Sequence, residues 1–227
     1  WYEGRYDGDI WGYTTKGIAK TQAEMDAHLA KVNQSQLGSN WSAGDIMYED
    51  LNGDGKISNG KNTVDDSGDL SIIGNKTPRY NYGITLDASY KRFDFRLFLQ
   101  GVGKRDFATS GSYFWGASGG KWQTVVFKEH LDYFRNDPNH PLGQNLDSPR
   151  PDWDSGRNRH TQTRYLQNAA YLRVKNIQLG YTLPQEVSEK IGISNLRVYI
   201  SGENILTFTK LSKLYDPEML GIGYGDE

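Results

Sequence analysis

The residues of this chain that best suit a chemical role by type and spacing lie in one short loop: Asp50, Asn52 and Asp54. Oxygen ligands at positions 1, 3 and 5 of such a loop converge on one cation, and a glycine at position 6 allows the sharp turn. The backbone carbonyl at position 7, here that of Lys56, adds a fourth oxygen. The spacing therefore predicts a Ca²⁺ site, although position 12, normally a bidentate Glu, is Lys61.

Three acids that follow this loop, Asp65, Asp66 and Asp69, could supply the missing ligand after a small insertion. The same run of Asp, Asn and Gly also fits an Asx-rich turn without an ion, because these side chains hydrogen-bond to the backbone two residues on. The spacing leaves both interpretations open.

Other reactive side chains form weaker patterns. Residues 116–120 fit the G-x-S-x-G pattern, but they lack the preceding strand and following helix that expose a nucleophile, so a flexible loop is favoured. The histidines show no metal-ligand spacing and are expected at the surface of loops: His28, His130, His140 and His160. No catalytic residue is predicted, and an enzyme is not expected.

Four aromatic residues lie close together in a long polar segment: Tyr113, Phe114, Trp115 and Trp122. Flat rings of this kind can stack on the faces of sugars, which makes these residues candidates for substrate binding. They can also pack the segment against a partner protein, and packing is the favoured interpretation.

The composition excludes several classes of protein. The 227 residues include no cysteine, so neither disulfides nor a cysteine-ligated metal is possible, and a net charge of −2 gives no field to attract nucleic acid. No run of 18 apolar residues predicts a transmembrane helix. The low mean hydropathy of −0.73 still allows a membrane β-barrel, in which only alternate strand residues face lipid.

Alternation of apolar and polar side chains predicts a long hairpin over residues 79–103. One run extends from Tyr80 to Tyr90 and the other from Phe93 to Leu99, on either side of a tight turn. Each run exceeds the length of about 5–6 residues that is typical of soluble strands, and suits a tilted membrane strand of about 9–11 residues.

Two further strands are expected at 170–183 and 196–208. The first changes phase near Asn176, which predicts a β-bulge. One parity of the second would face lipid: Leu196, Val198, Ile200, Gly202, Leu206 and Phe208. A soluble β-sandwich produces the same alternation, so periodicity alone leaves both architectures open.

The remaining segments are expected to be mainly loops. Thr21 and Glu24 form a capping box, which predicts a short amphipathic helix over residues 22 to about 33. Residues 34–78 are rich in Asn, Gly, Ser and Asp, and 104–167 show no convincing strand. Such a long loop is unusual in a compact soluble domain and common on the outer side of transport barrels.

Several strings, in this order and spacing, resemble the C-terminal third of the SusC/RagA family of TonB-dependent transporters. They lie at residues 8–13, 44–55, 72–75, 78–80, 98–102, 171–184, 196–199, 201–204 and 215–218. No single string is decisive, but together they cover essentially the whole chain.

The resemblance implies an all-β fold: antiparallel strands of a large transmembrane β-barrel of about 22 strands with long extracellular loops, present here as a C-terminal fragment. The plug, the segment that contacts TonB and most of the barrel would precede Trp1, and a last strand would follow Glu227. The expected parts of the chain (1–227) are a loop region with a short helix (1–78), a hairpin (79–103), an extracellular loop (104–167), a second hairpin (168–209) and the start of another loop (210–227).

The implied function is import of oligomeric nutrients, most commonly glycans and in some relatives peptides, across the outer membrane of a Gram-negative bacterium. The implied partners are a SusD-like surface lipoprotein, TonB and membrane lipid, with no nucleic acid. The alternative is a soluble, calcium-dependent carbohydrate-binding β-domain.

Overall fold

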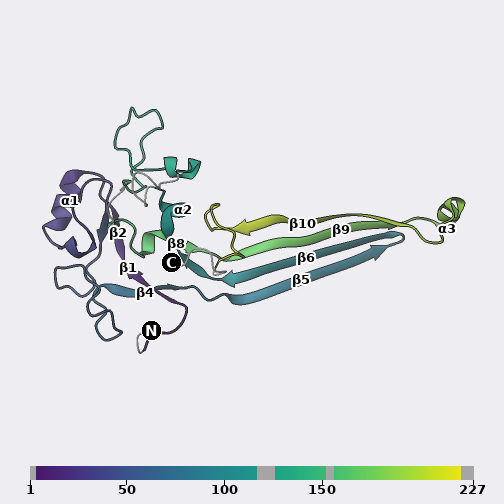
Figure 1. Ribbon diagram of the computed structural model, residues 1–227, viewed down its shortest axis with the longest axis horizontal. Coiled ribbons are helices and arrows are strands. Elements are labelled where there is room, and N and C mark those ends of the chain that lie inside the picture. The colour runs from purple at the N-terminus through teal and green to yellow at the C-terminus, as the bar shows by residue number, and fades with distance from the viewer. Residues whose placement is uncertain (1–3, 117–125, 152–155, 221–227) are drawn as a thin grey trace. The chain divides into compact units, whose positions relative to one another are not determined.

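The computed structural model describes residues 4–116, 126–151 and 156–220, which fall into two compact units (Figure 1). The sheet unit comprises Pro78–Arg105 and Asn168–Glu218, and the loop unit comprises Trp1–Thr77, Asp106–Gln167 and Met219–Glu227. Within the described ranges, no helix combines the length and apolar character needed to cross a bilayer.

The sheet unit is one antiparallel sheet of four long strands. They are β5 (Arg79–Tyr90), β6 (Phe93–Lys104), β9 (Tyr171–Thr182) and β10 (Arg197–Thr209), in the spatial order β10-β9-β6-β5 (Figure 1). The predicted hairpin is therefore present, and the other two predicted strands are β9 and β10. Tyr80 departs from the expected alternation, because its φ of 59° takes it out of the regular register, in which Arg79 pairs with Lys104 and Asn81 with Val102.

The bulge predicted near Asn176 is confirmed. Phe98 of β6 pairs with Asn176, and the next residue, Leu99, pairs with Val174. Lys175 is therefore the extra residue, and its insertion shifts the parity of β9 by one. The apolar side chains before and after the bulge consequently stay on the same face of the sheet.

Strand β10 is irregular at the same level. Glu203 pairs with Asn176 and Leu206 with Val174, so two residues of β10 lie between consecutive pairs. One of them, Asn204, has a φ of 51°, in the left-handed region that asparagine tolerates better than most residues. The irregularities of the two strands match, and pairing resumes on both sides of them.

The connections β5–β6 and β9–β10 lie at the same end of the sheet (Figure 1). The first is a two-residue turn in which Lys91 has a φ of 56°. The second contains α3 (Gln185–Ser188) and a 3₁₀ turn, η4 (Glu189–Ile191). Pro184 precedes this helix, where its missing N–H leaves no helical hydrogen bond unmade.

The loop unit contains more regular structure than the sequence predicted. Three short two-stranded pairs are present. β1 (Asp9–Tyr13) with β4 (Leu70–Asn75) and β2 (Thr15–Ile18) with β3 (Ile46–Tyr48) are antiparallel, and β7 (Asp106–Ala108) pairs with β8 (Leu166–Asn168). The expectation of loop throughout 34–78 and of no strand in 104–167 was therefore wrong. Strands of three to six residues are too short to establish a readable period of two.

Helix α1 (Gln22–Leu29) begins as its capping box predicts but ends earlier than expected. The Thr21 hydroxyl accepts the Glu24 N–H at 3.2 Å, and the Glu24 carboxylate accepts the N–H of Lys20 rather than that of Thr21. The other helical segments of the loop unit are α2 (Gly111–Trp115) and the 3₁₀ turns η1 (Ser35–Leu37), η2 (Lys128–Leu131) and η3 (Thr163–Tyr165).

The loop unit has a conventional buried core, gathered from widely separated segments. Its buried members are Tyr13, Ile18, Val32, Leu37, Ile46, Tyr48 and Ile57, with Trp41, Leu70, Phe134 and Tyr165 packed against them. Segments expected to be long loops therefore contribute to one folded body.

His28 is also buried in this unit, so the expectation of a surface histidine was wrong at this position. Its Nε2 lies 3.1 Å from Gln34 Oε1. Because that oxygen also accepts the Tyr48 N–H, while Gln34 Nε2 donates to the carbonyl of Ile46, the His28 Nε2 must be the donor. Desolvation lowers the pKa of His28, with a smaller contribution in the same direction from nearby lysines.

Candidate functional site

The two faces of the sheet unit differ in chemistry. Residues paired across an antiparallel sheet point to the same side, so the registers of β5, β6, β9 and β10 assign each side chain to a face. The apolar face consists of Tyr82, Ile84, Leu86, Ala88, Tyr90, Phe93, Phe95, Leu97, Leu99, Leu172, Val174, Ile177, Leu179, Tyr181, Val198, Ile200, Leu206 and Phe208, with Gly101 and Gly202. No charged side chain lies within it.

This apolar face is exposed. Leu86 is 53% exposed, Phe208 59% and Ile200 74%. Soluble proteins rarely expose contiguous apolar patches larger than a few hundred Å², and such a surface marks contact with another protein or with a membrane.

Aromatic rings lie at both ends of the apolar face. Tyr90, Phe93 and Tyr181 form one cross-strand row beside the short turn, and the rings of Phe93 and Tyr181 are 4.7 Å apart. Tyr82 and Phe208 lie towards the other end. Eight residues separate Tyr82 from Tyr90, which is about 27 Å along a strand. A tilt of about 40° reduces this to about 20 Å, comparable with the apolar band of roughly 25 Å on an outer-membrane barrel.

The opposite face, here called the polar face, carries the charged and hydrogen-bonding side chains. Its members are Asn81, Thr85, Asp87, Ser89, Asp94, Arg96, Gln100, Arg173, Asn176, Gln178, Thr182, Arg197, Ser201, Glu203, Thr207 and Thr209. Phe98, Val102, Tyr171 and Tyr199 are exceptions on this side. The contrast between faces matches a barrel wall, with lipid on one side and a polar interior on the other.

Ion pairs cross the polar face between strands. Arg96 Nε donates to Asp87 Oδ1 at 2.6 Å between the neighbouring strands β6 and β5. Arg197 of β10 reaches over β9 to Asp94 of β6, with an Nε–Oδ1 distance of 2.9 Å. The residue beneath is Gly180, where an added Cβ would lie 2.4 Å from an Asp94 oxygen and 2.5 Å from Arg197 Nη2. Only glycine leaves room for this pair.

The structure closes the Asp50 loop with hydrogen bonds from its own backbone. The two carboxylate oxygens of Asp50 accept the N–H groups of Gly53 and Gly55, each at 2.8 Å. Asn52 Oδ1 accepts the N–H of Asp54 at 3.0 Å. These bonds, the one from Gly55 foremost, lower the pKa of Asp50, so its carboxylate is ionised at neutral pH as a calcium ligand requires.

Two of the three acids named as substitute ligands, Asp69 and Asp66, have other roles. Asp69 is fully buried, and its two oxygens accept the N–H groups of Leu51 and Ser58, so it closes the base of the loop. Asp66 pairs with Lys61 at 3.7 Å. Across the described ranges, no cluster of three or more His, Cys, Asp or Glu side chains is placed to hold a metal. Each Asp50 and Asn52 oxygen that accepts one of the loop's own N–H groups keeps a second lone pair.

The candidate aromatic residues of the long segment pack against one another and their neighbours. The Trp115 ring lies 4.8 Å from that of Tyr165, and the Phe114 ring 6.0 Å from it. Tyr113 packs on Phe127 at 5.1 Å and stays 47% exposed. Trp122 lies outside the described residues, as do residues 117–120 of the G-x-S-x-G string.

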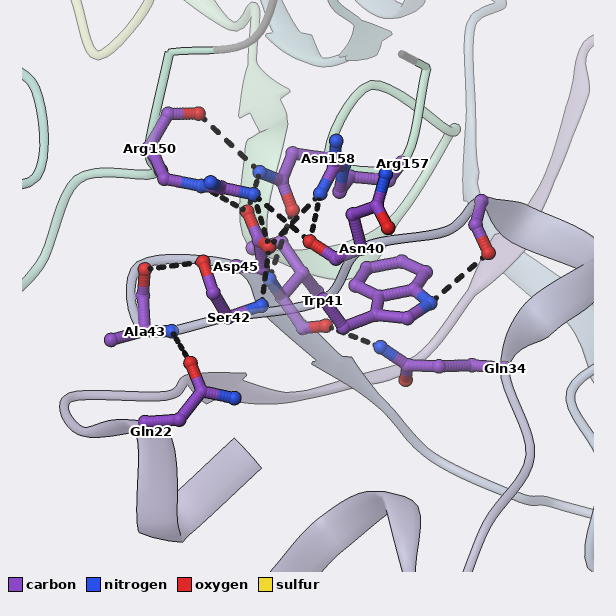
Figure 2. A network of polar contacts seen from close by, with 12 residues as sticks. Gln22, Gln34, Asn40, Trp41, Ser42, Ala43, Asp45, Arg150, Arg157 and Asn158 are labelled. Carbon is purple, nitrogen blue, oxygen red and sulfur yellow. Dashed lines mark hydrogen bonds and ion pairs between the residues drawn. The ribbon is translucent and has the colours of Figure 1, made fainter. Parts of the chain in front are cut away.

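A buried carboxylate, Asp45, joins two distant segments of the loop unit (Figure 2). Its Oδ2 accepts a hydrogen bond from Arg150 Nη2 at 2.9 Å, and its Oδ1 accepts one from Asn158 Nδ2 at 2.9 Å. Arg157 Nη1 lies 3.5 Å from Oδ2. A single anion therefore fastens Arg150, Arg157 and Asn158 to the turn before strand β3.

Two further bonds extend this network. Asn158 Oδ1 accepts the N–H of Ile46 at 2.9 Å, and the Tyr48 hydroxyl donates to the carbonyl of Arg157 at 2.6 Å. Burial raises the pKa of Tyr48, so this hydroxyl stays protonated. Sequence analysis missed the network because Asp45 and Arg150 are 105 residues apart. The one available signal was the presence of Asp45 in a family-like string.

Comparison with solved structures shows which proteins share the fold of this chain. The solved structures of RagAB, described as a peptide transporter and, in an open-open state, as a peptide importer, match with TM-scores of 0.58 and 0.57. Both matches cover 94% of this chain and 20% of the other, at 22% sequence identity. The fold is therefore that of a segment of RagA-like transport proteins.

The sequence comparison agrees with the structural comparison. The chain is 30% identical over 207 residues to TonB-dependent receptor P3 of Formosa agariphila, and 28% identical over 210 residues to TonB-dependent receptor P26 of the same organism. No family model matches. These similarities confirm the resemblance found in the motifs: the chain is similar to a segment of SusC/RagA-like TonB-dependent transporters. It spans about a fifth of the length of these relatives (18% and 19%).

The matched proteins are receptors and transporters rather than enzymes, as the sequence analysis expected. The fold is mostly strand and antiparallel, which agrees with the predicted all-β class.

Proposed function

We propose that this chain contributes four wall strands and part of the extracellular loops to an outer-membrane β-barrel of a Gram-negative bacterium that imports oligomeric nutrients. The observation that carries the proposal is the continuous exposed apolar face, bounded by aromatic rows and backed by a charged face. In the proposed barrel the apolar face contacts lipid and the polar face lines the interior.

The edges of the sheet support the same proposal. Strands β5 and β10 each have one side without a partner strand among the described residues. In a bilayer each unpaired backbone group costs several kcal/mol, so spanning sheets close on themselves. We propose that further strands of the transporter pair with β5 and β10 and complete a barrel of about 22 strands.

The alternative, a soluble calcium-dependent carbohydrate-binding domain, requires a second layer over the apolar face. Ile84, Val198 and Ile200 remain more than half exposed in the chain. A sandwich buries such residues between its two sheets. Purification separates the two proposals, because a soluble domain stays monodisperse without detergent, whereas the barrel precipitates when detergent is removed.

For the substrate we propose an oligosaccharide or a peptide. Glycan import is the commonest expectation from the SusC/RagA resemblance, and the structural neighbours are described as peptide importers. Tyr113, with its ring half exposed, is the best placed of the three described aromatic candidates to contact substrate. Phe114 and Trp115 pack on Tyr165.

For partners we propose a SusD-like surface lipoprotein on the extracellular side and TonB on the periplasmic side. Both come from the family resemblance, and TonB would act through parts of the transporter other than this chain. We also propose that the Asp50 loop binds Ca²⁺ through Asp50, Asn52, Asp54 and the backbone carbonyl of Lys56.

The topology of the proposed barrel follows from its connections. Short turns of these barrels lie on the periplasmic side and long loops outside. The turn at Lys91-Arg92 and the connection 183–196 share one end of the sheet, which we assign to the periplasm. Residues 106–167 are then extracellular.

Labelling of intact cells tests this assignment. A single cysteine at the exposed residue Asn139 of the full-length transporter should react with an impermeant maleimide, and one at the exposed residue Lys190 should not. Both should react after lysis, which controls for accessibility. Labelling of Lys190→Cys but not Asn139→Cys in intact cells would show that the topology is inverted.

A further inference from the structure

The chain returns to the polar face of the sheet after β10 ends at Thr209. Arg173 lies on that face, where it pairs in register with Gln100 on one side and Thr207 on the other. Its guanidinium reaches two acids of the returning segment: Nη2 lies 2.7 Å from Asp216 Oδ1 and Nη1 lies 2.8 Å from Glu218 Oε2. Its Nε donates to the Thr207 hydroxyl at 2.8 Å.

A second cation strengthens this attachment. Lys175 Nζ lies 3.0 Å and 3.2 Å from the two carboxylate oxygens of Glu218. Lys175 is the extra residue of the β9 bulge, and bulges re-aim side chains. The insertion therefore has a consequence besides the parity shift: it places a lysine beside Arg173, so two cations of β9 share the acid Glu218.

Residues 210–218, here called the strap, also have local order of their own. Glu218 N–H donates to Asp216 Oδ1 at 2.9 Å, which sets the two acids side by side. The Leu211 N–H donates to the Thr209 hydroxyl at 3.1 Å, and the Leu211 side chain is buried. The Thr209 hydroxyl in turn donates to the carbonyl of Ala170 at 2.9 Å.

The attachment differs in burial from the other ion pairs of the polar face. The Arg173 side chain is 9% exposed, whereas Arg197 and Asp94 are each 37% exposed. Charge-assisted hydrogen bonds are worth more where solvent is excluded, and exposed pairs contribute little. Arg173 is therefore the main attachment point of the strap.

We propose that the strap is a releasable cover on the polar face, fastened by Asp216 and Glu218 to Arg173 and Lys175. While it is fastened, these two cations are neutralised by the chain itself. Release uncovers a pair of positive charges on this part of the polar face. This role of the strap rests on the proposed function, in which the polar face lines the transport path.

Hydrogen exchange of the full-length transporter in detergent tests the proposal. Replacing both acids with isosteric amides, Asp216→Asn with Glu218→Gln, removes the charge attraction with little change of volume. The backbone amides of 210–218 should then exchange about tenfold faster or more, because hydrogen bonds to charged groups contribute about 1.5–3 kcal/mol. The amides of β9 should keep their protection.

The matched control is Asp94→Asn, which weakens the Arg197 pair on the same face and should leave exchange in 210–218 unchanged. Unchanged exchange of the strap in the double variant, or equal acceleration in the control, would overturn the proposal. Import activity is not part of this readout. Failure of the strap proposal and failure of the transport proposal are therefore distinguishable, the latter being tested by cell labelling and detergent dependence.

Discussion

The loop unit buries its large apolar side chains, whereas the sheet unit exposes them: Ile46 of the former is fully buried, and Ile200 of the latter is 74% exposed. The carboxylates Asp45 and Asp87 show the reverse arrangement. Asp45 of the loop unit is fully buried, while Asp87 and Arg96 of the sheet unit are more than half exposed. The loop unit thus has a buried apolar core, and the sheet unit presents one exposed apolar face and one polar face.

The largest expected effect on stability comes from removing a buried carboxylate of the loop unit, compared with an exposed one of the sheet unit. Asp45→Ala leaves the buried Arg157 without its carboxylate, so the loop unit should lose about 3–5 kcal/mol. Asp87→Ala, which removes an exposed pair of the sheet unit, should cost no more than about 1 kcal/mol. Hydrogen exchange in the full-length transporter reports each unit separately. Similar losses in both variants would contradict the contrast in burial.

A charge introduced on the apolar face should cost more folding free energy than one introduced on the polar face. Leu86→Arg places a cation on the apolar face and should cost about 2–4 kcal/mol near the middle of the bilayer. Thr85→Arg, one residue away on the polar face, should be tolerated far better. Folding of the transporter into lipid vesicles under denaturant measures both. Equal costs would mean that the face assignment is wrong.

A smaller effect, confined to the loop unit, follows from the buried His28. Its folded pKa is lowered, so the unfolded chain binds a proton at a higher pH than the native one. The stability of the loop unit should therefore fall as pH drops below about 6.5, the ordinary histidine value, and level off below the folded pKa. His28→Gln retains a donor towards Gln34 and should flatten this dependence.

Thermal melting of the transporter at a series of pH values from neutral to mildly acidic measures this pH dependence. Hydrogen exchange of residues 22–48 reports the loop unit specifically. An identical slope in wild type and His28→Gln would assign the acid sensitivity to other groups.

The smallest expected effect concerns the Asp50 loop. If the loop binds calcium, the ion should raise the melting temperature, and Asp50→Ala with Asp54→Ala should abolish that rise. Asp26→Ala, which removes an exposed acid of helix α1 that is not a candidate ligand, should leave it intact. Equal order of the loop in calcium and in chelator would favour the Asx-rich turn, which the bonds from Gly53 and Gly55 already stabilise.

The sheet unit was largely predictable from the sequence because its strands are long. Twelve residues of β5 give a clear period of two, and the slip in phase near Asn176 located the bulge. What periodicity could not decide was the surrounding of the apolar face, because lipid and a second sheet select the same alternation.

The loop unit could not be predicted in the same way. Tyr13, Leu37, Tyr48 and Ile57 come from separate short segments, and no local pattern indicates that they meet. The Asp45 network likewise depends on Arg150, more than a hundred residues away. Of the Asp50 loop, sequence predicted the turn residues but not the role of Asp69, whose carboxylate closes the base from outside the motif.

Gly180 has a consequence for how the wall could assemble. The Asp94–Arg197 pair passes over this residue and connects β6 directly to β10, two strands that share no backbone hydrogen bond. This ion pair therefore links β6 to β10 across β9, and β10 cannot separate from β9 without also breaking the pair. Separation of β10 during insertion or mechanical unzipping of the wall therefore breaks this side-chain pair together with the backbone ladder to β9.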